Sequence, residues 1–167
     1  MDLPRIFRHL SMTNGKVKQT FPHATLHAIE QAIKTSETTH VGEIRFVVEG
    51  ALDGYELFAL HSQSARERAL DVFSHWRMWD TEHNTGVLIY LLLADRQVEI
   101  VADRGIHAKA GSRAWTSICH AMESAFKGGH YQDGALSGIE AVTLQLTEHF
   151  PAQAGNRNEL PDRPLVL

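Results

Sequence analysis

One apolar segment, residues 87–94, constrains the fold more than any other part of the chain. Every residue from Val87 to Ala94 is apolar, and β-branched, leucine and aromatic side chains make up most of it. A strand with this pattern is buried on both faces of a sheet, so helices are needed on both sides to cover it. Only Asp95 and Arg96 separate the segment from Gln97–Asp103, in which polar and apolar residues alternate. So short a link predicts an antiparallel hairpin.

The other expected elements follow from the spacing of apolar residues. Helical spacing covers about residues 3–14, 22–38, 55–79, 112–126 and 133–150, and a further strand is predicted at Ile44–Glu49. Because a helix joins Ile44–Glu49 to the strand at 87–94, these two strands are expected to be parallel. The predicted class is α/β, a three-layer α/β/α sandwich around a small mixed sheet. Its first two strands are parallel and its last two form the antiparallel hairpin.

The length of 167 residues suits a single domain. We expect that domain to span residues 1–150, with a helical extension at residues 1–20. Residues 151–167 show no periodicity and contain proline, glycine, asparagine and charged residues. This composition predicts a flexible C-terminal tail.

The charge balance and the apolar runs exclude two classes of partner. Lys and Arg total 16 against 20 Asp and Glu, a formal net charge of -4. No basic field is available for a nucleic acid, so no nucleic-acid partner is expected. The longest apolar run is far below the roughly 20 residues that a membrane helix requires, and the N-terminus lacks the apolar core of a signal peptide. With one cysteine, Cys119, the chain is predicted to be a soluble cytoplasmic protein.

Three segments carry the pattern of a known family. They are ALDVFSHW at 69–76, NTGVLIYLLLADRQVEIVADRGI at 84–106 and AFKGGHYQDGALSGIEAV at 125–142. Together they resemble the TPM domain, a family named for a thylakoid lumen protein, a photosystem II repair protein and a modulator of levamisole receptors. The resemblance covers about residues 22–150 and implies an α/β/α fold. It also implies acid phosphatase activity, as described for plant members, or a cation-binding accessory role, with calcium as the cation. Where the family has a Gly-Tyr-Gly-Leu element, this chain has Asp103-Arg104-Gly105-Ile106.

Two groups of oxygen-bearing side chains are candidate ligands for Ca²⁺ or Mg²⁺. Asp53 and Asp95 follow the two parallel strands, at the edge where open α/β sheets bind ligands. The other group is expected at the opposite edge and comprises Glu43, Glu82, Asn84 and Asp103. Carboxylate and amide oxygens suit these hard cations. Polar turn and loop residues that face water would produce the same pattern, so both interpretations stay open.

A basic segment before a predicted helix is the candidate anion site. It comprises Arg104, His107, Lys109 and Arg113, with Ser112 as the cap of the helix. A helix N-terminus offers free N–H groups and a partial positive charge to a phosphate or carboxylate. A basic loop that faces water is the alternative.

No catalytic residue is identified, because no nucleophile, base and orienting group occur together in a recognisable arrangement. We expect a TPM-domain protein that acts as a binding or accessory module with a divalent cation. The alternative is a metal-assisted acid phosphatase acting on phosphate monoesters, in which the acidic group holds the metal and the basic segment holds the phosphate. A protein partner fits the first hypothesis, and the sequence does not indicate an oligomeric state.

Overall fold

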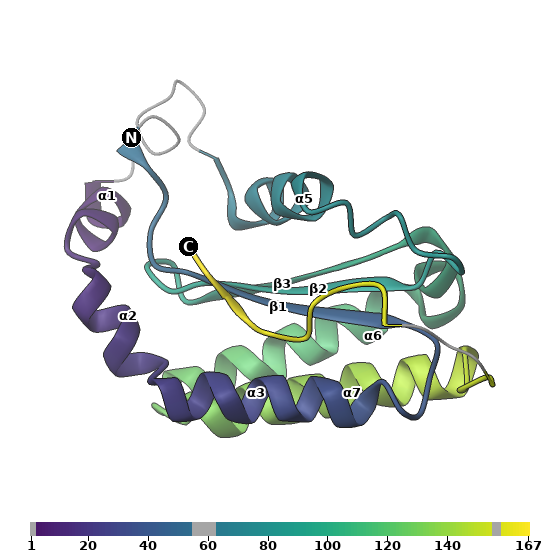
Figure 1. The fold of residues 1–167 in the computed structure, drawn as a ribbon. Helices are drawn as coiled ribbons and strands as arrows, with labels where there is room; N and C mark the ends of the chain where they lie inside the picture. The colour runs from purple at the N-terminus through teal and green to yellow at the C-terminus, as the bar shows by residue number, and fades with distance from the viewer. Residues whose placement is uncertain (1–2, 55–62, 155–157) are drawn as a thin grey trace.

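The computed structural model describes residues 3–54, 63–154 and 158–167. It is an α/β fold in which helices cover both faces of one open, mixed sheet of four strands (Figure 1). The elements in chain order are α1 (Leu3–Leu10), α2 (Asn14–Thr20), α3 (His23–Ser36), β1 (Glu43–Glu49), α5 (Ala65–His75), β2 (Gly86–Leu92), β3 (Gln97–Ala102), α6 (Arg104–Lys127), α7 (Tyr131–His149) and β4 (Leu165–Val166). Helix α5 lies on one face of the sheet, and α3, α6 and α7 lie on the other.

The strands run in the order β3-β2-β1-β4. β1 and β2 are parallel from Glu43↔Gly86 to Glu49↔Leu92, and β2 and β3 are antiparallel. These two pairings are the expected ones. The hairpin link is longer than predicted, because β2 ends at Leu92 and β3 begins at Gln97. Arg96 closes this longer turn with a positive φ of 54°.

A fourth strand corrects the expected sheet, which consisted of the parallel pair and the hairpin alone. β4 comes from the C-terminal segment and is parallel to β1, with Val47 opposite Leu165 and Val48 opposite Val166. The backbone N–H of Leu167 also donates to the carbonyl of Val48 at 2.9 Å. A strand of two residues has no detectable period, so the sequence pattern does not reveal it.

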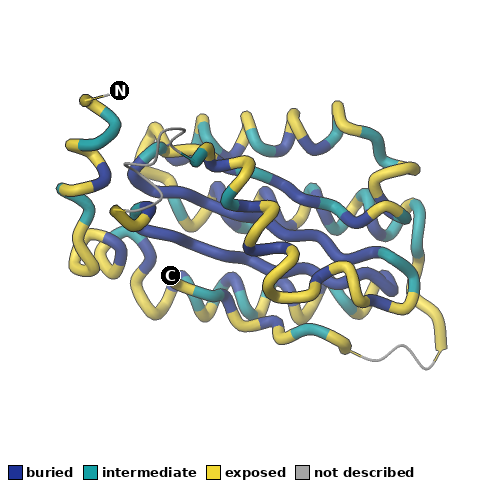
Figure 2. The backbone as a smooth tube through the Cα atoms, turned by 90° about the horizontal axis from the view of Figure 1, so that it is seen from above, coloured by how far each residue is buried: buried dark blue, intermediate teal, exposed yellow. Residues whose placement is uncertain are grey.

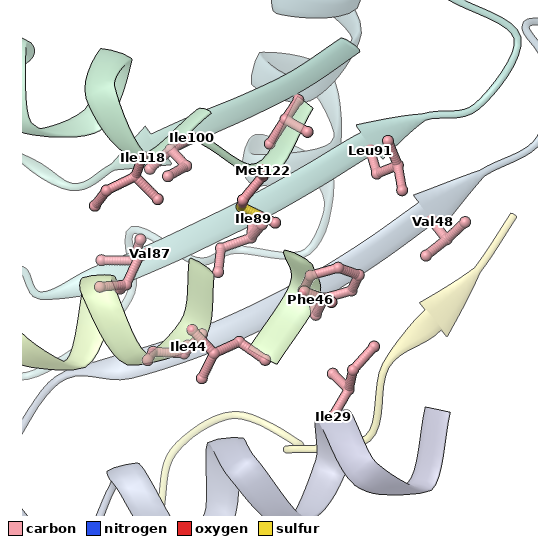
Figure 3. Packing of buried hydrophobic residues seen from close by; sticks show 14 of the residues in the cluster. Ile29, Ile44, Phe46, Val48, Val87, Ile89, Leu91, Ile100, Ile118 and Met122 are labelled. Atoms are coloured by element: carbon pink, nitrogen blue, oxygen red, sulfur yellow. The ribbon is translucent and has the colours of Figure 1, made fainter. Parts of the chain in front are cut away.

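The hydrophobic core forms two clusters, one on each face of the sheet. All residues of β1 and β2 are buried (Figure 2). Alternate residues, among them Phe46 and Ile89, pack toward α3, α6 and α7 (Figure 3). The intervening residues, among them Val47 and Leu88, pack toward α5. Burial on both faces of the segment at 87–94 is therefore confirmed.

Several helix boundaries differ from the predicted ones because of local caps. Helix α5 begins at Ala65, after Ser64, whose side chain accepts from the N–H of Glu67 at 3.2 Å. The predicted helix began near residue 55, and residues 55–62 lie outside the described residues. Helix α6 begins at Arg104, with Asp103 as its N-cap, and its backbone is interrupted at Gly111, the residue after which a helix is predicted to begin.

A second short helix, separate from α1, lies within the predicted helical extension at residues 1–20. Helix α2 begins at Asn14, the residue at which the first helix was expected to stop. The hydroxyl of Thr13 caps it by accepting from the N–H of Lys16 at 3.3 Å. No helix among the described residues is both long enough and apolar enough to cross a membrane.

Close packing at the start of β2 predicts that Gly86 does not tolerate a side chain. A Cβ atom on Gly86 would lie 2.0 Å from the backbone carbonyl oxygen of Met78. We expect Gly86→Ala to lower the free energy of unfolding by about 2–3 kcal/mol, as measured by urea denaturation. Gly15→Ala is the matched control, because its nearest neighbour is the Thr13 hydroxyl at 3.7 Å. Equal stability of the two variants would contradict the predicted clash.

Candidate functional site

The carboxyl ends of β1 and β2 form the edge at which ligands bind in open α/β sheets. The backbone pairing of the two strands continues past their ends, since the N–H of Leu93 donates to Glu49 at 2.9 Å and that of Ala94 donates to Gly50 at 3.0 Å. The loops that carry Asp53 and Asp95 therefore leave the sheet at the same edge, as the sequence predicted.

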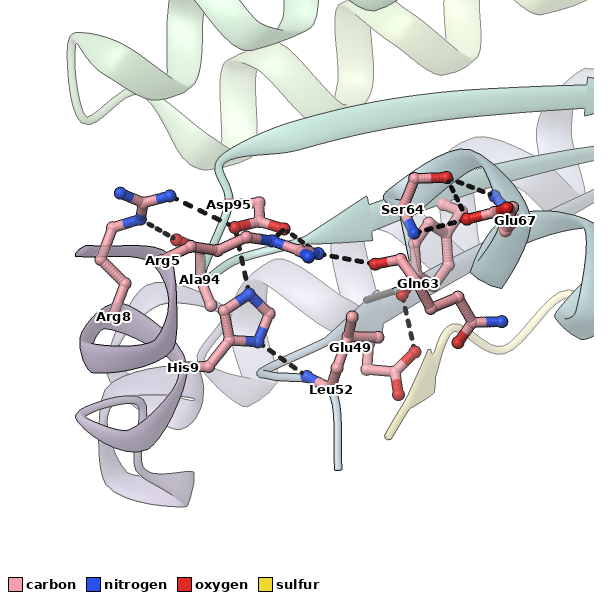
Figure 4. A network of polar contacts seen from close by, with 11 residues as sticks. Arg5, Arg8, His9, Glu49, Leu52, Gln63, Ser64, Glu67, Ala94 and Asp95 are labelled. Atoms are coloured by element: carbon pink, nitrogen blue, oxygen red, sulfur yellow. Dashed lines mark hydrogen bonds and ion pairs between the residues drawn. The ribbon is translucent and has the colours of Figure 1, made fainter. Parts of the chain in front are cut away.

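Helix α1 covers this edge and holds the carboxylate of Asp95 (Figure 4). The guanidinium of Arg5 donates to Oδ2 at 2.8 Å. His9 contacts Oδ1 through Nε2 at 3.0 Å, and Arg8 reaches the same oxygen at 3.5 Å. The other ring nitrogen of His9, Nδ1, accepts from the N–H of Leu52 at 3.0 Å. Because Nδ1 is an acceptor, the proton of the neutral imidazole lies on Nε2 and is donated to Asp95.

The surroundings of Asp95 keep it ionised. Its side chain is only 5% exposed, and burial alone would raise its pKa. The hydrogen bonds from Arg5 and His9 outweigh burial and hold the pKa of Asp95 below its ordinary value. Both carboxylate oxygens are occupied by donors from α1, so Asp95 does not fit a bound cation in this arrangement. Asp53 is exposed on the neighbouring loop.

A second polar cluster lies beside Asp95, on the face of the sheet that α5 covers. Glu49 is buried at the end of β1, and Arg68 binds both of its carboxylate oxygens, at 2.8 and 2.9 Å. The hydroxyl of Tyr90 donates to Glu49 at 2.7 Å, and burial raises the pKa of Tyr90. Arg5 also donates to the carbonyl of Gln63, just before α5, at 2.8 Å. No sequence pattern predicts this cluster, because its residues come from three separate elements, β1, α5 and β2.

The acidic group predicted at the opposite edge does not form one cluster. Glu43 and Glu82 contact the C-terminal segment, whereas Asn84 and Asp103 contact the start of α6. Glu43 accepts from the backbone N–H groups of Glu159 and Leu160, each at 3.1 Å. Glu82 is exposed, and its backbone N–H donates to the carboxylate of Glu159 at 3.2 Å. These contacts attach the C-terminal segment to the sheet.

Asn84 and Asp103 meet around the start of α6. The side-chain oxygen of Asn84 accepts from Arg104 at 3.0 Å, and Oδ1 of Asp103 accepts from the backbone N–H of Arg104 at 2.7 Å. The buried Oδ2 of Asp103 has no hydrogen-bond partner among the described residues. A Cβ on Gly105 would lie 2.6 Å from the carbonyl oxygen of Asn84, which explains why a glycine is needed there. Within the described parts of the chain, no three His, Cys, Asp or Glu side chains are grouped so as to hold a metal ion.

Glu37 joins Glu43 in a crowded carboxylate pair that sequence reasoning missed. Oε1 of Glu37 accepts from the N–H of Ile44 at 3.2 Å. Burial, reinforced by the charge of Glu43, raises the pKa of Glu37 to about 9. Burial likewise raises the pKa of Glu43 to about 7, although its two backbone hydrogen bonds oppose the shift. The position of Glu37 at the end of a helix gives no sequence signal for this pairing.

The predicted basic loop is part of α6, and its residues do not converge on one point. Arg104 turns to Asn84, whereas Lys109 contacts the carbonyl of His149 at 3.4 Å and lies 4.3 Å from the ring centroid of Phe150. The backbone at Gly111 breaks the helix with a φ of 77°. The remaining candidates are exposed, namely His107, Ser112 and Arg113.

His107 and Ser112 line a cavity of about 410 Å³ beside the edge strand β3. Two side chains in this cavity form hydrogen bonds with backbone groups of this strand. Arg66 donates to the carbonyl of Ile100 at 2.7 Å, and Glu123 accepts from the N–H of Val98 at 3.0 Å. Burial raises the pKa of Cys119, which also lines the cavity, to about 12. A thiol that stays protonated is a poor nucleophile.

The ion pairs of Asp95 predict a large loss of stability when its charge is removed. Asp95→Asn would leave Arg5 and His9 facing a neutral amide, and we expect the free energy of unfolding to fall by about 2–4 kcal/mol. Asp80→Asn is the control, because Asp80 pairs with Arg77 on the surface and is 53% exposed. That variant should change stability by less than about 0.5 kcal/mol. Similar losses in both variants, measured by urea denaturation, would contradict the assigned role of Asp95.

The raised pKa values of Glu37 and Glu43 predict that stability falls as pH rises. The folded protein retains protons that the unfolded chain releases above about pH 4.5, so stability is lost between about pH 4.5 and pH 9. Glu37→Gln should flatten this slope and stabilise the fold near about pH 8 by one to a few kcal/mol. Glu148→Gln, which removes an exposed carboxylate, is the control. A wild-type melting temperature that rises over this range would disprove the prediction.

Comparison with known proteins assigns the family. The model of the TPM domain matches residues 17–145. The NMR structure of the BA42 protein from the psychrophilic bacterium Bizionia argentinensis is similar, with a TM-score of 0.75 and 29% identity, over 86% of this chain and 93% of that one. The N-terminal domain of a P. gingivalis protein shares the fold, with a TM-score of 0.61 and 19% identity, over 78% and 81% of the two chains. No curated protein matches the sequence. The family match covers most of the chain, which therefore belongs to the TPM domain family.

Proposed function

We propose that this chain is a binding or accessory module of the TPM family rather than a phosphatase. The observation that supports this proposal most directly is that Arg5, Arg8 and His9 of α1 contact the carboxylate of Asp95 and so close it to other ligands. Helix α1 precedes the residues that match the family model, 17–145. An extension of this chain thus supplies positive charge at the carboxyl edge of the parallel strands, where strand topology predicts a ligand site.

The contacts of the other candidate groups support the same proposal. A metal-assisted hydrolase needs carboxylate oxygens that are open to the metal and a base or nucleophile near the substrate. Here the hydroxyl of Ser64 is engaged in the cap of α5, and the thiol of Cys119 is kept protonated by burial. Arg104 and Lys109 contact different parts of the protein and do not form a shared phosphate clamp.

Cation binding at Asp95, which its position after a parallel strand predicts, would require the release of α1. Arg5→Gln combined with Arg8→Gln removes both guanidinium groups from Asp95, so Ca²⁺ should stabilise this variant more than the wild type. A ligand at one hundred times its Kd stabilises a fold by about 2.7 kcal/mol, which a thermal melt detects. Arg77→Gln is the matched control, because it frees the isolated surface carboxylate of Asp80. An equal response to Ca²⁺ in all three proteins, with NaCl at matched ionic strength subtracted, would refute closure by α1.

The phosphatase alternative is tested on the same proteins. We expect the wild type to release no more phosphate from p-nitrophenyl phosphate than Asp95→Asn does, with or without Mg²⁺ or Ca²⁺. Wild-type activity that is abolished both by a chelator and by Asp95→Asn would overturn the proposal in favour of a metal-assisted hydrolase.

A further inference from the structure

Helix α1 is amphipathic, but it is oriented opposite to an ordinary surface helix. Two of its polar side chains point into the protein, with His9 buried and Arg5 only 14% exposed at the side chain. Three of its apolar residues, Leu3, Phe7 and Leu10, are 68%, 73% and 67% exposed, whereas Ile6 is half-buried. Because they stand at positions i, i+4 and i+7, they form one stripe along the helix. We call these three residues the α1 stripe.

The ion pairs with Asp95 maintain this orientation. Rolling the helix to bury the α1 stripe would withdraw Arg5 and His9 from Asp95 and leave a carboxylate that is 5% exposed without countercharge. An uncompensated buried charge is strongly destabilising. Figure 4 shows Arg5, Arg8 and His9 directed from α1 toward the loop of Asp95. The outward position of the α1 stripe is thus a consequence of the strongest polar contacts that the helix makes.

The chain around the α1 stripe is positively charged. Residues 1–29 contain Arg5, Arg8, Lys16 and Lys18 and a single acidic residue, Asp2, although the whole chain has a net charge of -4. Arg8 is 48% exposed, and Lys16 and Lys18 of α2 are exposed as well. Helices α1 and α2 together form one end of the molecule (Figure 1). An apolar stripe accompanied by exposed cations is typical of helices that lie in the interface of an anionic bilayer.

We propose that α1 docks this protein on an anionic membrane surface. The proposal builds on the proposed function, since it names what the binding module binds. Leu3, Phe7 and Leu10 enter the boundary between headgroups and acyl chains, while the exposed cations Arg8, Lys16 and Lys18 face lipid phosphates. Each basic residue near such a surface strengthens binding several-fold.

A second copy of the chain suits the α1 stripe less well. Two copies that met through α1 would bring the same exposed cations, Arg8, Lys16 and Lys18, toward one another. Three side chains also provide less contact than the roughly 800 Å² per partner of a stable interface. An anionic bilayer offers opposite charge and an apolar layer at once.

Vesicle sedimentation with the full chain tests the proposal. We expect the wild type to sediment with vesicles of phosphatidylcholine mixed with phosphatidylglycerol and to remain in solution with phosphatidylcholine alone. Phe7→Ser combined with Leu10→Ser should weaken binding at least about tenfold, because the apolar contribution scales with buried area. Leu144→Ser is the matched control, since Leu144 is 63% exposed on α7. Binding by that variant should equal that of the wild type.

Charge and self-association complete the test. Lys16→Gln combined with Lys18→Gln should weaken vesicle binding several-fold, and added salt should do the same to the wild type. Failure of the wild type to bind anionic vesicles, or binding that survives Phe7→Ser with Leu10→Ser, would overturn the proposal. A wild-type dimer that this double variant dissociates in sedimentation velocity would assign the α1 stripe to a second copy instead. Phosphate release plays no part in these measurements, so their failure is distinct from failure of the proposed function.

Discussion

Burial of β1 and β2 on both faces is the constraint on which the rest of the structure depends. Every polar side chain that these strands carry must find its partner within the protein, because water does not reach it. Glu49 is satisfied by Arg68 and Tyr90, which fixes α5 on the sheet. Glu43 is satisfied by backbone N–H groups of the C-terminal segment, and the guanidinium of Arg45 donates to the carbonyl of Pro161. The polar residues of the central strands therefore determine how the surrounding segments are placed.

Buried carboxyl groups at the two ends of the parallel strands β1 and β2 are stabilised in opposite ways. At the carboxyl edge, cations supplied by α1 lower the pKa of Asp95 and keep it charged. At the amino edge, burial raises the pKa values of Glu37 and Glu43, and nearby carboxylates, Glu43 for Glu37 and Glu159 for Glu43, add to the shift, which favours the protonated forms. Glu37 and Glu43, which retain protons above about pH 4.5, therefore lie at the edge remote from α1, whereas Asp95 at the other edge has its countercharge.

The parts of the fold that the sequence predicts are those encoded by local periodicity. The apolar run at 87–94 and the alternation after it identify the hairpin, and helical spacing identifies α3 and α7. The Asp95 site could be placed only in part, because its position after a strand is local information but its partner Arg5 lies 90 residues away. The same holds for β4, whose two residues pair with β1 from a segment without periodicity. Long-range polar contacts leave no spacing in the sequence by which to find them.

Closure of the strand edge and exposure of the α1 stripe are two results of one set of contacts. Arg5 points inward to give Asp95 its countercharge, His9 points inward to donate a hydrogen bond to it, and the helical period then places Leu3, Phe7 and Leu10 on the outer side. A surface that binds those apolar residues in their outward position also favours the arrangement in which Asp95 is paired. Binding at the α1 stripe and closure of the edge are therefore linked thermodynamically, and each stabilises the other.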